Sequence, residues 1–300
     1  MTASQRIFYG KVMLFGEYSV IEGSDALLIP YRKVHAFLRM PEKSINTEAL
    51  SWSNRLLKSF AKYLSDLPIS PVDNEKLADD LNHGLYLEST IPANHGLGSS
   101  GSVCAAIYES YGKPSSSISL ISLKNTLANM ESFFHGKSSG ADPLCIFTDA
   151  PLLICEQQPV IQDEQIMNHA NKLNAFLVHG GKESKTDLLV WHFHEQMTHE
   201  SYRTDFRKTY MVRVNEIIRS WVNGKAEFQN IRVLSEMQLH FFKDMIPREA
   251  RTLWNEGIAS DVYAMKICGS GGGGMMLGFT KNSEETLKII GKEWMIEWLT

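Results

Sequence analysis

Residues 131–142 have the sequence Glu-Ser-Phe-Phe-His-Gly-Lys-Ser-Ser-Gly-Ala-Asp. They place one carboxylate, Glu131, at the end of a predicted helix and a second, Asp142, in a Gly/Ser loop. A separate glycine-serine loop, His-Gly-Leu-Gly-Ser-Ser-Gly at 95–101, precedes them. A loop that cradles phosphates, a carboxylate that holds a divalent ion and another that accepts a proton are the components of a phosphoryl-transfer site. The stretch therefore predicts this chemistry.

The composition is that of a globular enzyme. The 300 residues are 43% apolar, enough to bury the core of one large domain or two ordinary ones. A net charge of −4 does not indicate nucleic acid or an anionic membrane as partner. The chain start has no signal-peptide pattern, and no apolar run approaches the ~18–20 residues of a membrane span. The four cysteines stand singly in apolar runs, as in reduced cytoplasmic proteins. We therefore expect a cytoplasmic protein with no membrane or nucleic-acid partner. The sequence does not define the oligomeric state, and a homodimer stays open.

The hydrophobic patterns predict strands and helices that do not alternate strictly. We expect strands at 7–18, 26–30, 34–40, 84–89 and 145–155, and helices at 50–64, 102–111 and 120–136. A domain boundary is placed near residue 170, in the polar stretch 157–172. Beyond it we expect a strand at 174–178, several amphipathic helices between 187 and 254, and a closing unit of strand, glycine turn, strand, helix and strand over 262–299. This organisation indicates an α+β protein of two domains, 1–170 and 171–300.

The glycine loop is the strongest local signal for phosphate binding. Residues 96–101 match the dinucleotide pattern G-x-G-x-x-G, but Pro92 separates them from the preceding strand and no acidic residue follows about 20 positions on. Glycines let the backbone approach a ligand, and a helix starting at Ser102 directs its free N–H groups at the same point. A tight helix entry capped by Ser99 or Ser100 is the alternative. Three glycines exceed what a cap needs, so we predict phosphate binding.

Three charged residues each admit a structural alternative. Lys11 stands inside an apolar strand, so its ammonium either snorkels outward or meets a carboxylate. Asp142 precedes Pro143, the pattern of a helix N-cap followed by proline at the first helical position. Glu131, three residues before Phe134, falls at the edge of a buried helix face, where a carboxylate either reaches water or binds a hard cation.

Two further segments are interpreted structurally. Residues 269–274, Gly-Ser-Gly-Gly-Gly-Gly, are too short for a linker and predict a turn between strands whose bare backbone packs against another loop or a ligand. His192, His194, Glu195 and His199 miss the zinc motif H-E-x-x-H by one residue and lack a completing ligand. They favour a solvated polar segment.

Three motifs, in this order, resemble the family of galacto-, homoserine, mevalonate and phosphomevalonate kinases. They are Gly-Lys-Val-Met-Leu-Phe-Gly-Glu-Tyr at 10–18, Gly-Leu-Gly-Ser-Ser at 96–100, and residues 266–274. Within the family, residues 131–142 are similar to the mevalonate kinase signature, and Lys185-Thr186 is similar to another mevalonate kinase segment. The resemblance implies the GHMP kinase fold, with an N-terminal ribosomal-protein-S5-like domain, a C-terminal ferredoxin-like domain and the active site in the cleft between them. It also implies ATP-dependent, Mg²⁺-assisted phosphorylation of the primary hydroxyl of mevalonate to 5-phosphomevalonate, in isoprenoid biosynthesis.

The resemblance assigns roles to individual residues. Asp142 is expected to be the general base, paired with Lys11, while Ser100 and Glu131 hold Mg²⁺. The expected ATP-phosphate loop comprises Gly96, Leu97, Gly98, Ser99, Ser100, Gly101 and Ser102. The expected acceptor-binding residues are Lys11, Glu17, Tyr18, Asp142, Thr186, Gly271 and Gly272.

Departures from the family pattern concern the acceptor. Mevalonate kinases commonly carry histidine where this chain has Tyr18, and tyrosine there is also similar to phosphomevalonate kinases. Ser138 replaces the usual proline, and Gly101 the usual alanine.

Two other functions stay open at this point. Phosphomevalonate as acceptor requires extra basic residues, for which Lys137, Lys182 and Lys185 are candidates. A non-catalytic ligand sensor of this fold predicts loss of the base or the metal ligand, yet Lys11, Glu131 and Asp142 are all present.

Overall fold

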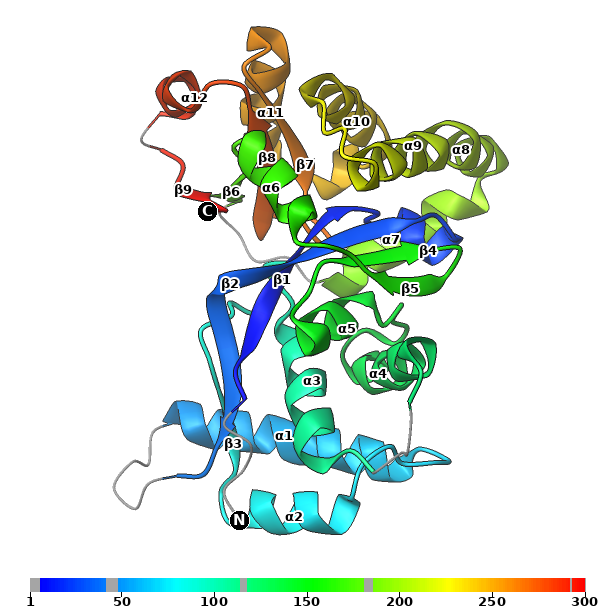
Figure 1. Cartoon of the computed structure of the whole chain (residues 1–300), viewed down its shortest axis with the longest axis vertical. Helices are drawn as coiled ribbons and strands as arrows, with labels where there is room; N and C mark the ends of the chain where they lie inside the picture. The colour runs from blue at the N-terminus through cyan, green and yellow to red at the C-terminus, as the bar shows by residue number, and fades with distance from the viewer. Residues whose placement is uncertain (1–5, 42–47, 114–117, 181–185, 292, 300) are drawn as a thin grey trace. The chain divides into compact units, whose positions relative to one another are not determined.

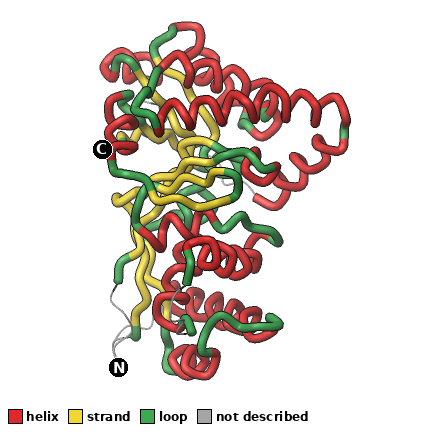
Figure 2. The backbone as a smooth tube through the Cα atoms, turned by 45° about the vertical axis from the view of Figure 1, so that its right-hand side comes forward, coloured by secondary structure: helices red, strands yellow, loops and turns green. Residues whose placement is uncertain are grey.

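The computed structural model describes residues 6–41, 48–113, 118–180, 186–291 and 293–299. The chain forms two compact units. Unit 1 comprises the described residues within Met1–Lys11, Pro30–Ala93 and Gly98–Asp149, and unit 2 those within Val12–Ile29, Asn94–Leu97 and Ala150–Thr300. The predicted domain division near residue 170 stays a prediction. Both units contain helices and antiparallel strand pairs, so the α+β prediction is confirmed. Figure 2 shows the helices and strands along the chain.

Unit 1 is mainly helical. Two strands, β1 and β2, run through both units, and the other elements of unit 1 are β3 and five helices. Their bounds are β1 Phe8–Phe15, β2 Ala26–Arg39, α1 Glu48–Asp66, α2 Asn74–Asn82, β3 Tyr86–Ser89, α3 Ser99–Tyr111, α4 Leu120–His135 and α5 Ala141–Thr148. Helix α1 packs against α2 and β3, while α3, α4 and α5 pack against one another (Figure 1).

Unit 2 holds the remaining elements. They are η1 Ser19–Glu22, β4 Leu152–Cys155, β5 Gln158–Ile161, α6 Gln165–Lys172, β6 Phe176–His179, α7 Thr186–Thr198, α8 Glu200–Asp205, the π-helical η2 Phe206–Tyr210, α9 Met211–Val222, α10 Phe228–Phe241, η3 Lys243–Met245, α11 Arg248–Ser260, β7 Tyr263–Ile267, β8 Met275–Thr280, α12 Ser283–Ile290 and β9 Ile296–Trp298. Strands β7, β8, β6 and β9 form one antiparallel sheet in that order.

Strand β2 replaces two predicted strands. It pairs with β4 through Ala26–Leu28 and with β3 through residues 36–39. Pro30, which lacks a backbone N–H, falls between these two paired stretches, where a missing donor breaks neither ladder. The strand therefore continues past Pro30, where the first of the two predicted strands ended.

Helix α5 corrects the strand predicted at 145–155. Residues 145–148 belong to this helix, and only Leu152–Cys155 is a strand. A short apolar run does not distinguish a buried helix from a buried strand by periodicity. Helix α5 is such a case, because Ala141, Leu144, Cys145 and Ile146 are all buried.

Two short helices were not expected. Helix α2 follows an Asp73 cap whose carboxylate accepts the Lys76 N–H. Helix α6 lies in the polar stretch chosen for the boundary, where Ile166 and Ala170, four residues apart, are its buried positions.

The described residues include no helix that is both long and apolar enough to cross a membrane. All four cysteines lie in the described part of the chain and none forms a disulfide.

Candidate active site

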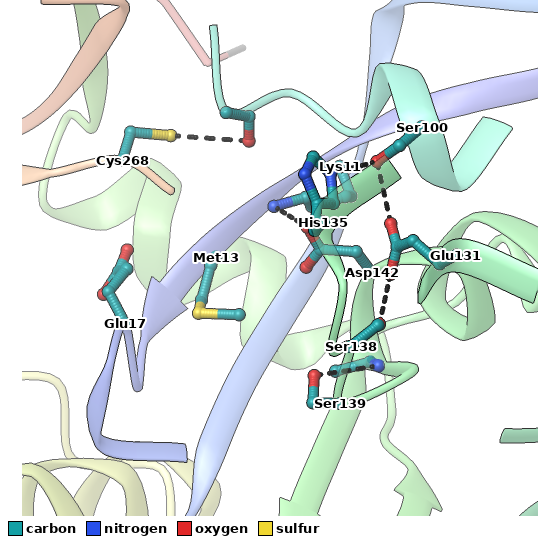
Figure 3. A network of polar contacts seen from close by, with 12 residues as sticks. Lys11, Met13, Glu17, Ser100, Glu131, His135, Ser138, Ser139, Asp142 and Cys268 are labelled. Carbon is teal, nitrogen blue, oxygen red and sulfur yellow. Dashed lines mark hydrogen bonds and ion pairs between the residues drawn. The ribbon is translucent and has the colours of Figure 1, made fainter. Parts of the chain in front are cut away.

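A buried lysine and a carboxylate form an ion pair in unit 1. The Lys11 Nζ lies 2.7 Å from Oδ2 of Asp142 (Figure 3). The Lys11 side chain is 1% exposed and that of Asp142 is 30% exposed. The snorkelling alternative for Lys11 is therefore wrong, because its ammonium stays inside and meets a carboxylate, as burial of a charge requires.

Asp142 is not a helix cap. The N-cap of α5 is Gly140, in the left-handed conformation, so Asp142 is the second helical residue and Pro143 the third. With no capping role, the Asp142 carboxylate is directed at Lys11.

Helix α3 begins earlier than predicted, at Ser99, with Gly98 as its N-cap. Its first intrahelical bond runs from the Ser102 N–H to the Gly98 carbonyl. The amides of Ser99, Ser100 and Gly101 precede that bond and have no carbonyl four residues back within the helix. Ser99 and Ser100 are thus first-turn residues rather than caps, and the helix start presents three N–H groups of the kind that bind anions.

Ser102 does not share this property. Its N–H donates to Gly98, its hydroxyl donates to the Ser99 carbonyl at 2.8 Å, and its side chain is fully buried. The Ser102 N–H and hydroxyl proton are thus engaged within the helix rather than directed at a phosphate.

Glu131 is buried between two serine hydroxyls. It is 4% exposed, so a carboxylate that reaches water is excluded. The Ser100 hydroxyl donates to Oε1 at 2.8 Å, and the Ser138 hydroxyl donates to Oε2 at 2.5 Å (Figure 3). Burial, aided by the Asp142 carboxylate, raises the pKa of Glu131 to about 7, while the bonds from Ser138 and Ser100 and the Lys11 charge oppose this rise.

His135 extends the same network. Its Nε2 lies 3.1 Å from the Ser100 Oγ. This distance is that of a hydrogen bond between the imidazole and the Ser100 hydroxyl. Neither His135 nor Ser138 was predicted to contribute to the site, although both stand within residues 131–142.

Gly98 brings the helix start and the ion pair together. Its φ is +90°, and a Cβ there would lie 2.6 Å from Ile146 Cδ1 and 3.0 Å from Lys11 Cγ. The backbone thus lies directly over the lysine side chain. A Cβ on Gly101 would lie 3.1 Å from Pro143 Cα, so glycine lets α3 approach α5 at this point.

A comparison with known proteins finds a family model that matches part of the chain. Residues 55–149 match the model of the GHMP kinases N terminal domain. This part of the chain is therefore similar to the N-terminal domain of GHMP kinases. This range contains Ser100, Glu131 and Asp142 and excludes Lys11. No curated protein matches the chain in a sequence comparison.

Solved GHMP kinases share the fold along nearly the whole chain. The Methanococcus jannaschii mevalonate kinase is 18% identical, with a TM-score of 0.62 over 97% of this chain and 96% of that one. The L. major mevalonate kinase in complex with R-mevalonate is 17% identical, with a TM-score of 0.63 over 96% and 90%. The Streptococcus pneumoniae phosphomevalonate kinase in complex with phosphomevalonate and AMPPNP is 16% identical, with a TM-score of 0.55 over 95% and 94%. At these identities the likeness establishes the fold and does not choose an acceptor.

The oxygen pair formed by Ser100 and Glu131 fits Mg²⁺. Oxygen ligands bind Mg²⁺ at about 2.0–2.1 Å in octahedral geometry, which puts adjacent ligands roughly 2.9 Å apart. The Ser100 Oγ and Glu131 Oε1 are separated by 2.8 Å. Proteins commonly hold Mg²⁺ through one or two such ligands, with phosphate oxygens and water completing the shell. No cluster of three His, Cys, Asp or Glu suited to a metal occurs among the described residues, and this includes the zinc-like segment on α7.

In unit 2, the predicted acceptor residue Glu17 forms an ion pair with Lys266, and both side chains are buried. The Lys266 ammonium also donates to the carbonyls of Ile267, at 2.7 Å, and Met13, at 3.2 Å. Three acceptors match its three protons. The pair thus anchors β7 to the end of β1.

Tyr18 has an unusual backbone. Its φ of 60° and ψ of −43°, with the Ser19 N–H donating to the Glu17 carbonyl at 2.7 Å, define a γ-turn with positive φ, which is strained for a non-glycine residue. The phenol is buried against Phe193 and Phe242. Its hydroxyl donates to the Ser270 carbonyl at 2.6 Å. Burial raises the pKa of Tyr18 above its usual value.

The glycine turn at 269–274 packs against residues 94–97. A Cβ on Gly96 would lie 2.5 Å from the Cys268 carbonyl, and one on Gly274 would lie 2.8 Å from the Asn94 carbonyl. The prediction that bare backbone here packs against another loop is confirmed.

The remaining predicted residues stay predictions. The Gly272 N–H donates to the Met245 carbonyl at 2.7 Å, and a Cβ on Gly271 would lie 3.0 Å from the same oxygen. Thr186 begins α7, but its side chain lies outside the described residues, as do Lys182 and Lys185.

Proposed function

We propose that this chain is an ATP-dependent kinase that phosphorylates the primary hydroxyl of mevalonate to give 5-phosphomevalonate, a step of isoprenoid biosynthesis. One observation carries the proposal. A lysine–aspartate pair at 2.7 Å stands in the same unit as a serine–glutamate pair at 2.8 Å and the first-turn amides of α3. Base, cation ligands and anion-binding amides are the components that phosphoryl transfer requires.

Asp142 and Lys11 are assigned to the acceptor hydroxyl. The carboxylate is the accessible partner of the ion pair, so it can meet a substrate hydroxyl and accept its proton. General-base catalysis of this kind contributes about 10²–10⁴-fold. The buried Lys11 ammonium stabilises the developing alkoxide, and it does so more strongly than it would in water because it is shielded from solvent.

Helix α3 and its preceding loop are assigned to the phosphates. The amides of Ser99, Ser100 and Gly101 bind phosphate oxygens, with Gly96, Leu97 and Gly98 forming the approach. Ser100 and Glu131 hold Mg²⁺ by the oxygen pair described above. MgATP, when bound, supplies the phosphoryl group and the cation charge that offsets charge build-up on it.

The choice of mevalonate rests on the similarity of residues 131–142 to the mevalonate kinase signature, with Glu17, Tyr18, Thr186, Gly271 and Gly272 as the proposed acceptor contacts. Phosphomevalonate is the alternative acceptor. Two features favour it, namely the tyrosine at position 18 and the exposed Lys137, which adds positive charge two residues after His135.

The test is ADP release from MgATP with mevalonate, phosphomevalonate, homoserine and galactose offered separately. We expect turnover with mevalonate. The Asp142→Asn variant, purified in the same way, serves as the control for contaminating kinases. Turnover with phosphomevalonate alone would show that the proposed acceptor is wrong and that the proposed kinase activity is right. No turnover with any of the four contradicts the proposed reaction and favours a non-catalytic ligand sensor.

A further inference from the structure

Ser138 occupies an unusual place in the network around Glu131. Its hydroxyl donates to Glu131 Oε2 at 2.5 Å and accepts the Gly140 N–H at 2.9 Å. A hydroxyl has one proton and two lone pairs, so both its donor and an acceptor position are engaged. Ser138 therefore connects the carboxylate of α4, a bond drawn in Figure 3, to the backbone at the start of α5.

The Gly140 end of this connection is held in place by close packing. Gly140 is the N-cap of α5 with a φ of +74°. A Cβ there would lie 2.3 Å from the Lys124 carbonyl, so only glycine fits against α4. Asp142 follows two residues later in the first turn of α5. The Ser138 hydroxyl is thus one short link between Glu131 and the turn that carries Asp142.

At the other end, the bond from Ser138 fixes the orientation of the Glu131 carboxylate. Its carboxylate is buried, so water does not hold it, and Ser100 binds only Oε1. A carboxylate held at one oxygen can turn about its terminal torsion, which has a broad energy profile. The Ser138 bond to the second oxygen removes that freedom and keeps Oε1 directed at Ser100.

We propose that Ser138 is a positioning residue that orients Glu131 for the cation and sets the spacing between Glu131 and Asp142. This inference rests on the proposed function, since it assigns Glu131 to Mg²⁺ and Asp142 to the proton. Partners of this kind, which do not touch the metal, commonly matter for metal affinity by about 10–100-fold.

Ser139 provides a matched control. It makes the equivalent turn bond one position further on, with the Ala141 N–H donating to its Oγ at 3.3 Å. Ser138 and Ser139 share the same loop, the same side chain and the same type of local bond. Ser138 additionally binds Glu131, so Ser139→Ala reports what loss of a turn bond alone does.

The experiment measures the Mg²⁺ dependence of AMPPNP binding by calorimetry, together with kcat and KM, for the wild type, Ser138→Ala, Ser138→Thr and Ser139→Ala. We expect Ser138→Ala to raise the Mg²⁺ concentration needed for half-maximal nucleotide binding roughly tenfold and to lower kcat, with acceptor KM nearly unchanged. Threonine keeps the hydroxyl and is expected to restore both values to within about threefold of the wild type. Ser139→Ala is expected to stay within about twofold.

Two outcomes overturn the positioning role while leaving the kinase intact: equal shifts in Ser138→Ala and Ser139→Ala, or a threonine variant no better than alanine. If the wild type binds AMPPNP without any Mg²⁺ dependence, the proposed cation site is contradicted. The positioning role of Ser138 is then contradicted as well. Calorimetry needs no turnover, so the two failures are told apart even if the acceptor is wrong.

Discussion

The Lys11 ammonium, 1% exposed, lies 2.7 Å from an Asp142 carboxylate that is 30% exposed. The two partners of one ion pair therefore differ in their access to water. Lys11 keeps its ammonium away from solvent, and the Asp142 carboxylate is exposed enough to contact a ligand. A pair that served stability alone would gain nothing from this difference, whereas a base and its electrostatic support require it.

Asp142→Asn is expected to abolish the proton acceptor while keeping the shape of the site. We expect kcat to fall by about 10²–10⁴-fold, because an amide cannot take the hydroxyl proton. Binding of AMPPNP, followed by thermal shift, should change little. A variant that keeps more than about a tenth of the wild-type kcat removes Asp142 as the base.

The same pair predicts unequal costs in stability. Asp142→Ala leaves a buried ammonium without its carboxylate, which costs about 3 kcal/mol or more in buried pairs. Lys11→Met instead replaces the buried charge with an apolar side chain of similar length and leaves a carboxylate that water can reach, so we expect a loss below about 1 kcal/mol. Urea unfolding of both variants measures the difference. Equal losses, or a larger one for Lys11→Met, contradict the asymmetry.

Glu131 should make the stability of the ligand-free protein depend on pH. Burial raises its pKa from 4.5 to about 7 in the folded state, so between these values the native protein binds more protons than the unfolded chain. The stabilisation relative to Glu131→Gln is therefore expected to be fully present below about pH 4.5, to decline as pH rises, and to level off above about pH 7. Urea unfolding in EDTA from pH 5 to 8 follows this difference. A difference that is constant with pH shows that Glu131 is already ionised in the fold.

Part of the site followed from residue chemistry together with the family resemblance. A lysine inside an apolar strand needs a partner, the resemblance assigned Asp142 to it, and the structure shows the bond. The helix ending at Gly136 followed from its apolar spacing and its glycine, and α4 ends at His135 with Gly136 as C-cap. At the helix end, one local rule determines the outcome.

Other features depend on tertiary contacts between elements. The short apolar run in α5 suited a strand as well as a helix, and only packing against α3 and α4 decides between them. The Ser138–Glu131 bond joins a loop to a helix end seven residues earlier and leaves no periodic trace. The γ-turn at Tyr18 holds a bulky residue where glycine is expected, so local preference alone argues against it.

Gly98→Ala is expected to disturb the ion pair through sterics. A left-handed φ costs a residue with a Cβ about 1–2 kcal/mol, and the new methyl would meet Ile146 and the Lys11 side chain. We expect a loss of stability in the upper part of that range or above, together with a lower kcat. Gly224→Ala is the matched control, since Gly224 has a φ of +79° and no atom near the added Cβ. It carries the backbone cost alone, so an equal stability loss in the two variants contradicts the close approach of Gly98 to Lys11.

Tyr18→Phe tests whether the strained turn belongs to the acceptor site. The variant loses the bond from the phenol to the Ser270 carbonyl, worth about 1 kcal/mol of stability. If Tyr18 contacts the acceptor, its KM should rise at least about fivefold while the KM for ATP stays within about twofold. Tyr202→Phe removes a similar bond, from its hydroxyl to the Phe241 carbonyl at 2.9 Å, and should cost comparable stability without changing acceptor KM. Steady-state kinetics of both variants tests this. If the strained turn at Tyr18 has a structural role only, Tyr18→Phe lowers stability but leaves the KM for the acceptor and the KM for ATP at their wild-type values.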